Sequence, residues 1–90
     1  MINKNGPKIK VYVPVLVRYD TDGKAIPLKF EFENGKVYVI TKIIDSRHAS
    51  ASVGGYGMRY DVIVNNSHEM YLFEQGGRWF VEAYGNEMKR

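Results

Sequence analysis

Hydrophobic and polar residues alternate along most of the chain, and glycine, asparagine or aspartate interrupts the alternation at short intervals. From Lys8, the stretch KIKVYVPVLVRYD places a valine at every second position between 11 and 17. A period of two is that of a β-strand with one buried face, so this stretch predicts a strand. Pro14 has no backbone N–H to donate in a ladder, which predicts an edge position or a bulge at that residue.

The strongest turn signal is Asn34-Gly35, between the alternating stretches PLKFEFE and KVYVITKIID. Asn-Gly is the preferred central pair of a two-residue type I′ hairpin. A two-residue loop fixes the register, and here it predicts that Phe30 faces Val39 and that Glu31 faces Tyr38. The predicted inner face then carries Leu28, Phe30, Phe32, Val37 and Val39, and the outer face carries Lys29, Glu31, Tyr38 and Lys42.

The rest of the chain keeps the same period. MRYDVIV, EMYLFE and RWFVEAY predict three further strands, separated by NNSH and QGG. Repeated short strands with turn signals every roughly 8 to 12 residues predict an all-β fold, a small six-stranded antiparallel barrel or sandwich with an SH3-like meander. The predicted core consists of Val11, Val13, Val15, Val17, Phe30, Phe32, Val37, Val39, Val62, Val64, Leu72 and Trp79.

Length and composition indicate a single domain over residues 1–90, with an ordered part at about 8–84 and loose ends. The chain is 44% hydrophobic and 13% aromatic, which supplies enough apolar side chains for a core. It contains no cysteine, which excludes a disulfide framework and a thiolate zinc site. Neither a signal peptide nor an apolar run of roughly 18 residues is present, so we expect a cytoplasmic protein without a membrane span.

The charge is mildly basic and concentrated in the first half of the chain. The net charge is +3, and the first fifty residues hold nine basic and five acidic side chains, against four and five in the rest. A basic and aromatic sheet face could bind single-stranded nucleic acid by stacking bases and following phosphates. A solvated face whose tyrosines cover lysine stems is the alternative. The candidate residues are Lys10, Tyr12, Arg18, Lys29, Tyr38 and Lys42.

The glycine-rich stretch SASVGGYG predicts a long connection over residues 46–57. A phosphate-binding loop would need a helix after its glycines and usually a lysine, whereas a strand is predicted here. A corner between two strands is therefore the favoured interpretation. Binding residues nevertheless gather on loops of a rigid scaffold, and on this basis the loop candidates for ligand binding are Arg47, His48, Tyr56 and Arg59.

The same segment contains the residue types of a nucleophilic triad. Asp45, His48 and three serines lie within eight positions. A working triad also needs hydrogen-bond order and an oxyanion hole, so a hydrolase acting through residues 45–52 is the least supported function. We expect Asp45 to end its strand instead. His48 and His68 are the only histidines, and metal sites need three or four convergent ligands, so neither a metal nor another cofactor is expected.

The last predicted hairpin is apolar on both faces. Tyr71, Phe73 and Phe80 exceed what one buried face requires, which predicts barrel closure or a self-association surface. The chain is therefore expected to be a non-catalytic binding module. A protein partner or a second copy is slightly favoured over single-stranded nucleic acid.

Several motifs resemble a known pattern. DGKAIPLKFEFENGKVYVITKIIDSR, GGYGMRY and YLFEQGGRWFVE are similar to a family of small bacterial proteins without an established activity. The resemblance covers the chain from about Tyr12 to Glu82, and Phe32 stands where the family usually has tryptophan. It implies a compact bacterial cytoplasmic domain and no particular activity.

Overall fold

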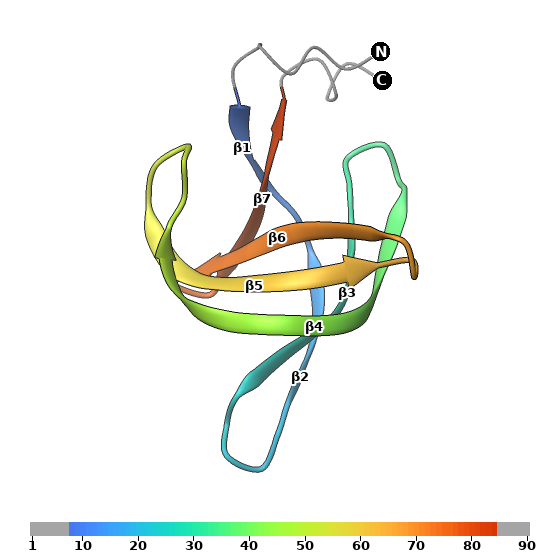
Figure 1. The fold of residues 1–90 in the computed structure, drawn as a ribbon, viewed down its shortest axis with the longest axis vertical. Coiled ribbons are helices and arrows are strands. Elements are labelled where there is room, and N and C mark those ends of the chain that lie inside the picture. Colours follow the sequence, from blue (N-terminus) through green and yellow to red (C-terminus); the bar gives the residue numbers. More distant parts are fainter. Residues whose placement is uncertain (1–7, 85–90) are drawn as a thin grey trace.

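The computed structural model describes residues 8–84, which form a curled antiparallel sheet with the shape of a half-barrel (Figure 1). The predicted all-β antiparallel fold is confirmed. In this part of the chain, no helix is long and apolar enough to cross a membrane. The ends predicted to be loose lie outside the described residues. The strands are β1 (Lys8–Tyr12), β2 (Val15–Tyr19), β3 (Ala25–Glu31), β4 (Val37–Ser50), β5 (Tyr56–Val64), β6 (His68–Gln75) and β7 (Arg78–Tyr84), in the sheet order β1-β7-β6-β5-β4-β3-β2.

The structure has seven strands rather than six because the first predicted strand is divided at Val13-Pro14. The N–H of Val13 donates to the carbonyl of Trp79 on β7 (3.0 Å), whereas the carbonyl of Pro14 accepts from the N–H of Glu31 at the end of β3 (3.3 Å). Proline has no N–H with which to continue a ladder on β7. The chain therefore changes partner at this step, and the consecutive strands β1 and β2 lie at opposite edges of the sheet.

The turn at Asn34-Gly35 is present, but its loop has three residues rather than two. The N–H of Phe32 donates to the carbonyl of Lys36 (2.9 Å), and the N–H of Gly35 donates to the carbonyl of Phe32 (2.8 Å). Gly35 has a φ of 85°, as expected for a type I turn followed by a left-handed residue. The same pair of hydrogen bonds closes the loops at 20–24 and 51–55.

The longer loop shifts the pairing of β3 with β4 by one residue. Phe30 faces Tyr38, and Lys29 faces Val39. A shift of one residue reverses the faces of a strand, so Val37 and Val39 are 45% and 46% exposed. The ring of Tyr38 instead stacks on that of Phe30, with centroids 5.2 Å apart. The predicted inward Val37 and Val39 and the predicted outward Tyr38 are therefore wrong.

Asn34 is compatible with both the two-residue and the three-residue loop. Contacts outside the turn therefore explain why the three-residue loop forms. Its side-chain oxygen accepts a hydrogen bond from the N–H of Lys36 (2.9 Å). The observed register also brings the ring of Tyr38 within 5.1 Å of Phe32, in addition to the stack on Phe30. Three interacting aromatic rings remove more apolar surface from water than two valines do.

The main core lies on the inner face of the curled sheet. Of the predicted core, Val15, Phe32 and Trp79 pack against the buried cluster, while Val17 is half-buried like Leu28. The cluster itself combines six predicted residues with three others; it comprises Val11, Val13, Phe30, Val62, Val64 and Leu72, together with Tyr60, Val81 and Ala83.

The predicted long connection over 46–57 is wrong. β4 continues past Asp45 to Ser50, and β5 begins at Tyr56, so only residues 51–55 connect the two strands. Gly57 lies within β5, where the backbone passes close to β6. A Cβ atom at this position would overlap with the carbonyl oxygen of Glu74, which explains the need for glycine.

The observed register predicts different effects for neighbouring residues on β4. Replacing Tyr38 by Ala should lower the free energy of unfolding by about 2 kcal/mol, because its half-buried ring packs on two phenylalanines. Val39→Thr should change it by less than about 0.5 kcal/mol, because Val39 is exposed. Urea unfolding followed by the fluorescence of Trp79 measures both changes. A larger loss at Val39 than at Tyr38 would contradict the register.

Burial of Tyr60 predicts a loss of stability in alkali. Its hydroxyl donates to the carbonyl of Ala25 (3.1 Å), and burial raises the pKa of Tyr60 above its usual value of 10.0, with the charge of Glu74 adding to the effect. As the pH rises, the unfolded chain therefore loses this proton first. The raised pKa of Tyr60 contributes fully to the free energy of unfolding below about pH 10. This contribution is lost as the pH rises through the higher pKa of the folded state.

Tyr60→Phe should therefore lose about 1 kcal/mol of stability at neutral pH, through the missing hydrogen bond. When the pH is raised from about 9 to about 11, the variant should lose less stability than the wild type does. Urea unfolding at several pH values tests both expectations. Tyr56→Phe, which removes an exposed tyrosine from the same strand, serves as the control and should keep the wild-type pH dependence. Equal alkaline losses in Tyr60→Phe and the wild type would contradict the assignment.

Candidate functional site

The six residues predicted to form a basic and aromatic face are distributed over separate parts of the sheet. β1 pairs with β7, while β2 lies at the opposite edge beside β3, so the residues of the first predicted strand are divided between two places. Tyr38 points inward and offers no outer stacking surface. The six are Lys10 and Tyr12 on β1, Arg18 on β2, Lys29 on β3, and Tyr38 and Lys42 on β4.

The four candidates assigned to a loop lie on strands. Arg47 and His48 belong to β4, whereas Tyr56 and Arg59 belong to β5. The rings of His48 and Tyr56 stack across the hairpin with centroids 5.9 Å apart. These side chains therefore lie on the paired strands of the β4–β5 hairpin and not on a flexible corner.

Both arginines of this hairpin already have carboxylate partners. Arg47 lies 3.5 Å from Asp45 in an exposed ion pair. Arg59 lies 2.9 Å from Asp61 in a largely buried pair, and its guanidinium carbon is 4.2 Å from the ring centroid of Tyr71. Their charges are thus matched within the chain.

The residue types of a triad in the 45–52 segment do not come together in the structure. β4 and β5 pair without irregularity from Asp45 to Ser50, so Asp45 and His48 point to opposite faces of the sheet. A histidine that turns away from its carboxylate cannot be oriented by it. In the described part of the chain, no group of three or more His, Asp or Glu side chains could hold a metal ion.

Phe73 and Phe80 form a second small core on the outer face. They are 2% and 1% exposed, and their rings stack with centroids 5.1 Å apart. Ala51 and Val53, from the loop between β4 and β5, pack over them. Phe73 and Phe80 are therefore wrong as members of a self-association surface, while Tyr71 remains 44% exposed.

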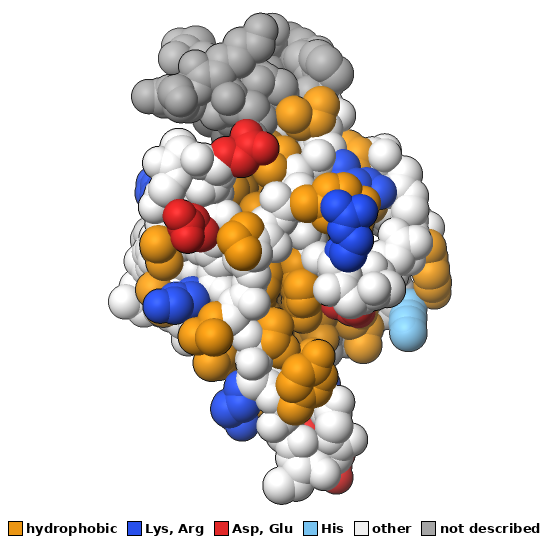
Figure 2. Space-filling model, turned by 180° about the vertical axis from the view of Figure 1, so that it is seen from behind, with side chains coloured by type: hydrophobic (Ala, Val, Ile, Leu, Met, Phe, Trp, Pro, Cys, Tyr) orange, Lys and Arg blue, Asp and Glu red, His pale blue; other side chains and the backbone are white. Residues whose placement is uncertain are grey.

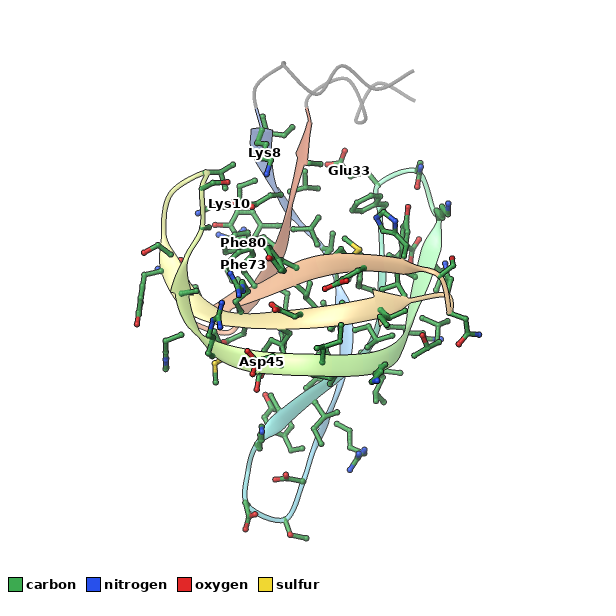
Figure 3. The ribbon with its side chains drawn as sticks, in the orientation of Figure 1. Lys8, Lys10, Glu33, Asp45, Phe73 and Phe80 are labelled. Atoms are coloured by element: carbon green, nitrogen blue, oxygen red, sulfur yellow. The ribbon has the colours of Figure 1, made fainter. Side chains whose placement is uncertain are left out.

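The carboxylate of Glu82 on β7 fixes this covering loop. It accepts hydrogen bonds from the hydroxyl of Ser52 (2.6 Å) and from the N–H of Val53 (3.1 Å). The ammonium of Lys10 lies 4.6 Å from the ring centroid of Phe80. Figure 3 shows Lys10, Phe80 and Phe73 together beside the β4–β5 loop.

A groove of 480 Å³ lies where the Val13-Pro14 step meets the turn between β6 and β7. Seen from behind, the molecule shows hydrophobic side chains gathered in a band along the middle of the face, with lysine and arginine beside them (Figure 2). We call the groove at the Val13-Pro14 step the Tyr12–Trp79 groove; its lining residues are Tyr12, Val13, Pro14, Val15, Gly77, Arg78 and Trp79.

Tyr12 is 42% exposed, yet its ring is held in position. The guanidinium carbon of Arg78 lies 3.6 Å from its centroid, and the ring of Phe80 makes a T-shaped contact with it, with centroids 5.8 Å apart. The ammonium of Lys10 lies 5.8 Å from the same centroid. Aromatic and cationic groups thus form a fixed cluster at one side of the groove.

The turn before β7 places Arg78 beside Tyr12. Gly76 and Gly77 both have positive φ, at 61° and 87°, which makes a two-residue hairpin with Gln75 opposite Arg78. Alternation along β7 then turns Trp79 to the inner side, where its ring lies 5.4 Å from that of Tyr60.

Sequence reasoning did not identify this groove. Trp79 was predicted only as a core residue, and Arg78 was not predicted as a functional residue. The motif QGGRW gives the turn, but the neighbourhood of Arg78 and Tyr12 depends on the pairing of β1 with β7. The alternation of hydrophobic and polar residues predicts a strand but does not predict which other strand pairs with it.

Comparison of the chain with protein-family models, with curated proteins and with solved structures gives no match. The SH3-like interpretation and the resemblance to small bacterial proteins therefore stay predictions. No relative supplies a function for the Tyr12–Trp79 groove, whose chemistry follows from its own side chains.

Proposed function

We propose that the protein is a non-catalytic binding module that recognises an extended segment of another protein at the Tyr12–Trp79 groove. One observation carries the proposal: the groove brings an exposed tyrosine, an arginine and a tryptophan together. These three residue types are the ones most enriched among residues that dominate the energy of protein interfaces.

The groove is also prepared for binding before a partner arrives. Arg78 and Phe80 hold the ring of Tyr12, and the ring of Trp79 is fixed against Tyr60. Ordering flexible side chains upon association costs free energy, so side chains that are already ordered favour binding. Pro14 adds an exposed and rigid apolar wall.

Exposed apolar side chains also lie on the outer face of β2 and β4, outside the lining of the groove. Leu16 is exposed and lies opposite Lys29, which in turn lies opposite the exposed Val39. This strip follows directly from the observed register, which turns Val39 outward.

Single-stranded nucleic acid is the less supported partner. Stacking of successive bases requires several exposed aromatic faces along a basic track. Arg78 already lies against the ring of Tyr12, and Tyr38 is turned inward. A protein segment makes better use of a local apolar and aromatic groove.

Selection from phage-displayed random dodecamer peptides tests the proposed function. We expect enrichment of peptides whose affinity falls by about tenfold in Tyr12→Ala, because the variant removes the central aromatic contact. Tyr56→Ala removes an exposed tyrosine on the β4–β5 hairpin and should bind within about twofold of the wild type. Fluorescence anisotropy with labelled peptides measures these affinities.

Failure to enrich any peptide, or equal binding by Tyr12→Ala and the wild type, would contradict this function. Labelled single-stranded oligodeoxythymidine provides the competing arm. Oligonucleotide binding that weakens steeply with salt and requires Tyr12 would favour the nucleic-acid alternative.

A further inference from the structure

We infer that the segment bound in the Tyr12–Trp79 groove presents an aspartate or glutamate side chain to the guanidinium of Arg78. The inference rests on the proposed protein-binding function and names the chemistry that selects the partner. It comes from the state of Arg78, which differs from that of every other arginine in residues 8–84.

The four arginines of the described chain fall into three situations. Arg47 and Arg59 each have an aspartate partner. Arg18 is exposed and has neither an ion pair nor an aromatic contact within residues 8–84. Arg78 is held by the ring of Tyr12, and within the same residues its guanidinium donates no hydrogen bond and forms no ion pair.

The contact with Tyr12 leaves the donors of Arg78 available. At 3.6 Å from the centroid, the guanidinium lies against the face of the ring. Its N–H groups lie in the plane of the cation and point away from that contact. A planar cation fixed in this way is prepared to bind both oxygens of a carboxylate through two parallel hydrogen bonds.

Charges around the groove also favour an anionic partner. The ammonium of Lys10 lies near the same ring and forms no ion pair within the described residues. The nearby carboxylates are engaged by loops, Glu74 by the N–H of Gly77 (2.7 Å) and Glu82 by Ser52 and Val53. Two cations therefore flank Tyr12 while the neighbouring acids serve the turns.

The lining of the groove indicates the rest of the ligand. Pro14, Val15 and Trp79 provide apolar surface next to the charged end. An extended segment advances about 3.3 Å per residue, so an acidic and an apolar side chain close in sequence can lie near each other on one bound segment. We therefore expect a partner with an acidic residue beside an apolar one.

The peptides enriched from the dodecamer library supply the probe for this inference. We expect them to share an aspartate or glutamate next to an apolar residue. Each is synthesised with an amidated C-terminus, so that a terminal carboxylate cannot provide the charge. A second form carries glutamine or asparagine at the acidic position, and isothermal titration calorimetry measures both against the wild type and the variants.

The neutral form should bind the wild type about tenfold more weakly than the acidic form, because the charge-assisted pair is lost. In Arg78→Gln, the two forms should bind with affinities within about twofold of each other, since the partner of the carboxylate is gone. Arg78→Lys keeps the charge but loses the planar fork. Its preference for the acidic form over the neutral form should therefore lie between those of the wild type and of Arg78→Gln. Arg18→Gln removes an exposed, unpaired arginine elsewhere on the sheet and should keep the full difference between the forms.

The outcomes separate this inference from the function on which it rests. Peptides that require Tyr12 but bind equally in acidic and neutral forms would overturn the acidic contact and leave the binding module standing. The absence of any Tyr12-dependent peptide would overturn both. Circular dichroism and urea unfolding of each variant confirm that a lost affinity does not come from a lost fold.

Discussion

The missing N–H of Pro14 is the constraint on which this architecture depends. Val13 still donates to Trp79 on β7, but the next residue has nothing to donate, and its carbonyl accepts instead from Glu31 at the end of β3, the neighbour of the edge strand β2. One continuous segment therefore joins the two edges of the curled sheet. The Tyr12–Trp79 groove lies at the point of the change, where the backbone leaves β7 beside the β6–β7 turn. The fold and its best candidate site thus have a common origin in one residue.

Much of the fold could be predicted because alternation is a local property of the chain. The period identified the strands, and it placed Val11, Val13, Val62 and Val64 in the core correctly. The register of β3 with β4 could not be obtained in the same way, because Asn34-Gly35 suits loops of two different lengths and the rings of Phe30, Phe32 and Tyr38 decide between them. Further along β4, pairing irregularities between residues 40 and 42 and between 43 and 45 change the buried face again. Such extra residues leave no mark in a period of two.

The candidate site was harder to predict because its parts meet only through long-range pairing. Tyr12 reaches Arg78 because β1 lies beside β7, and neither sequence stretch specifies the other. Phe73 and Phe80 suggested surplus apolar surface for the same reason, since Ala51 and Val53, which cover them, come from a different hairpin. A sequence pattern can show that a residue is apolar and outward on its strand. Whether another segment lies over it depends on the tertiary structure.

The union of β1 with β7 also imposes an order on how the molecule assembles. Each adjacent pair of strands from β2 to β7 is joined by a short turn, so each pair can form as soon as its two strands exist. The pairing of β1 with β7 instead joins residues as far apart in sequence as Lys8 and Tyr84. Closing so long a loop costs more entropy than closing a hairpin, so this pairing is expected to come last. During synthesis on the ribosome, β1 is made first and its partner β7 is made only after the five strands between them. Until then Val11 and Val13 have no β7 to cover them, and the nascent chain passes through a stage in which an apolar strand edge is open to other molecules.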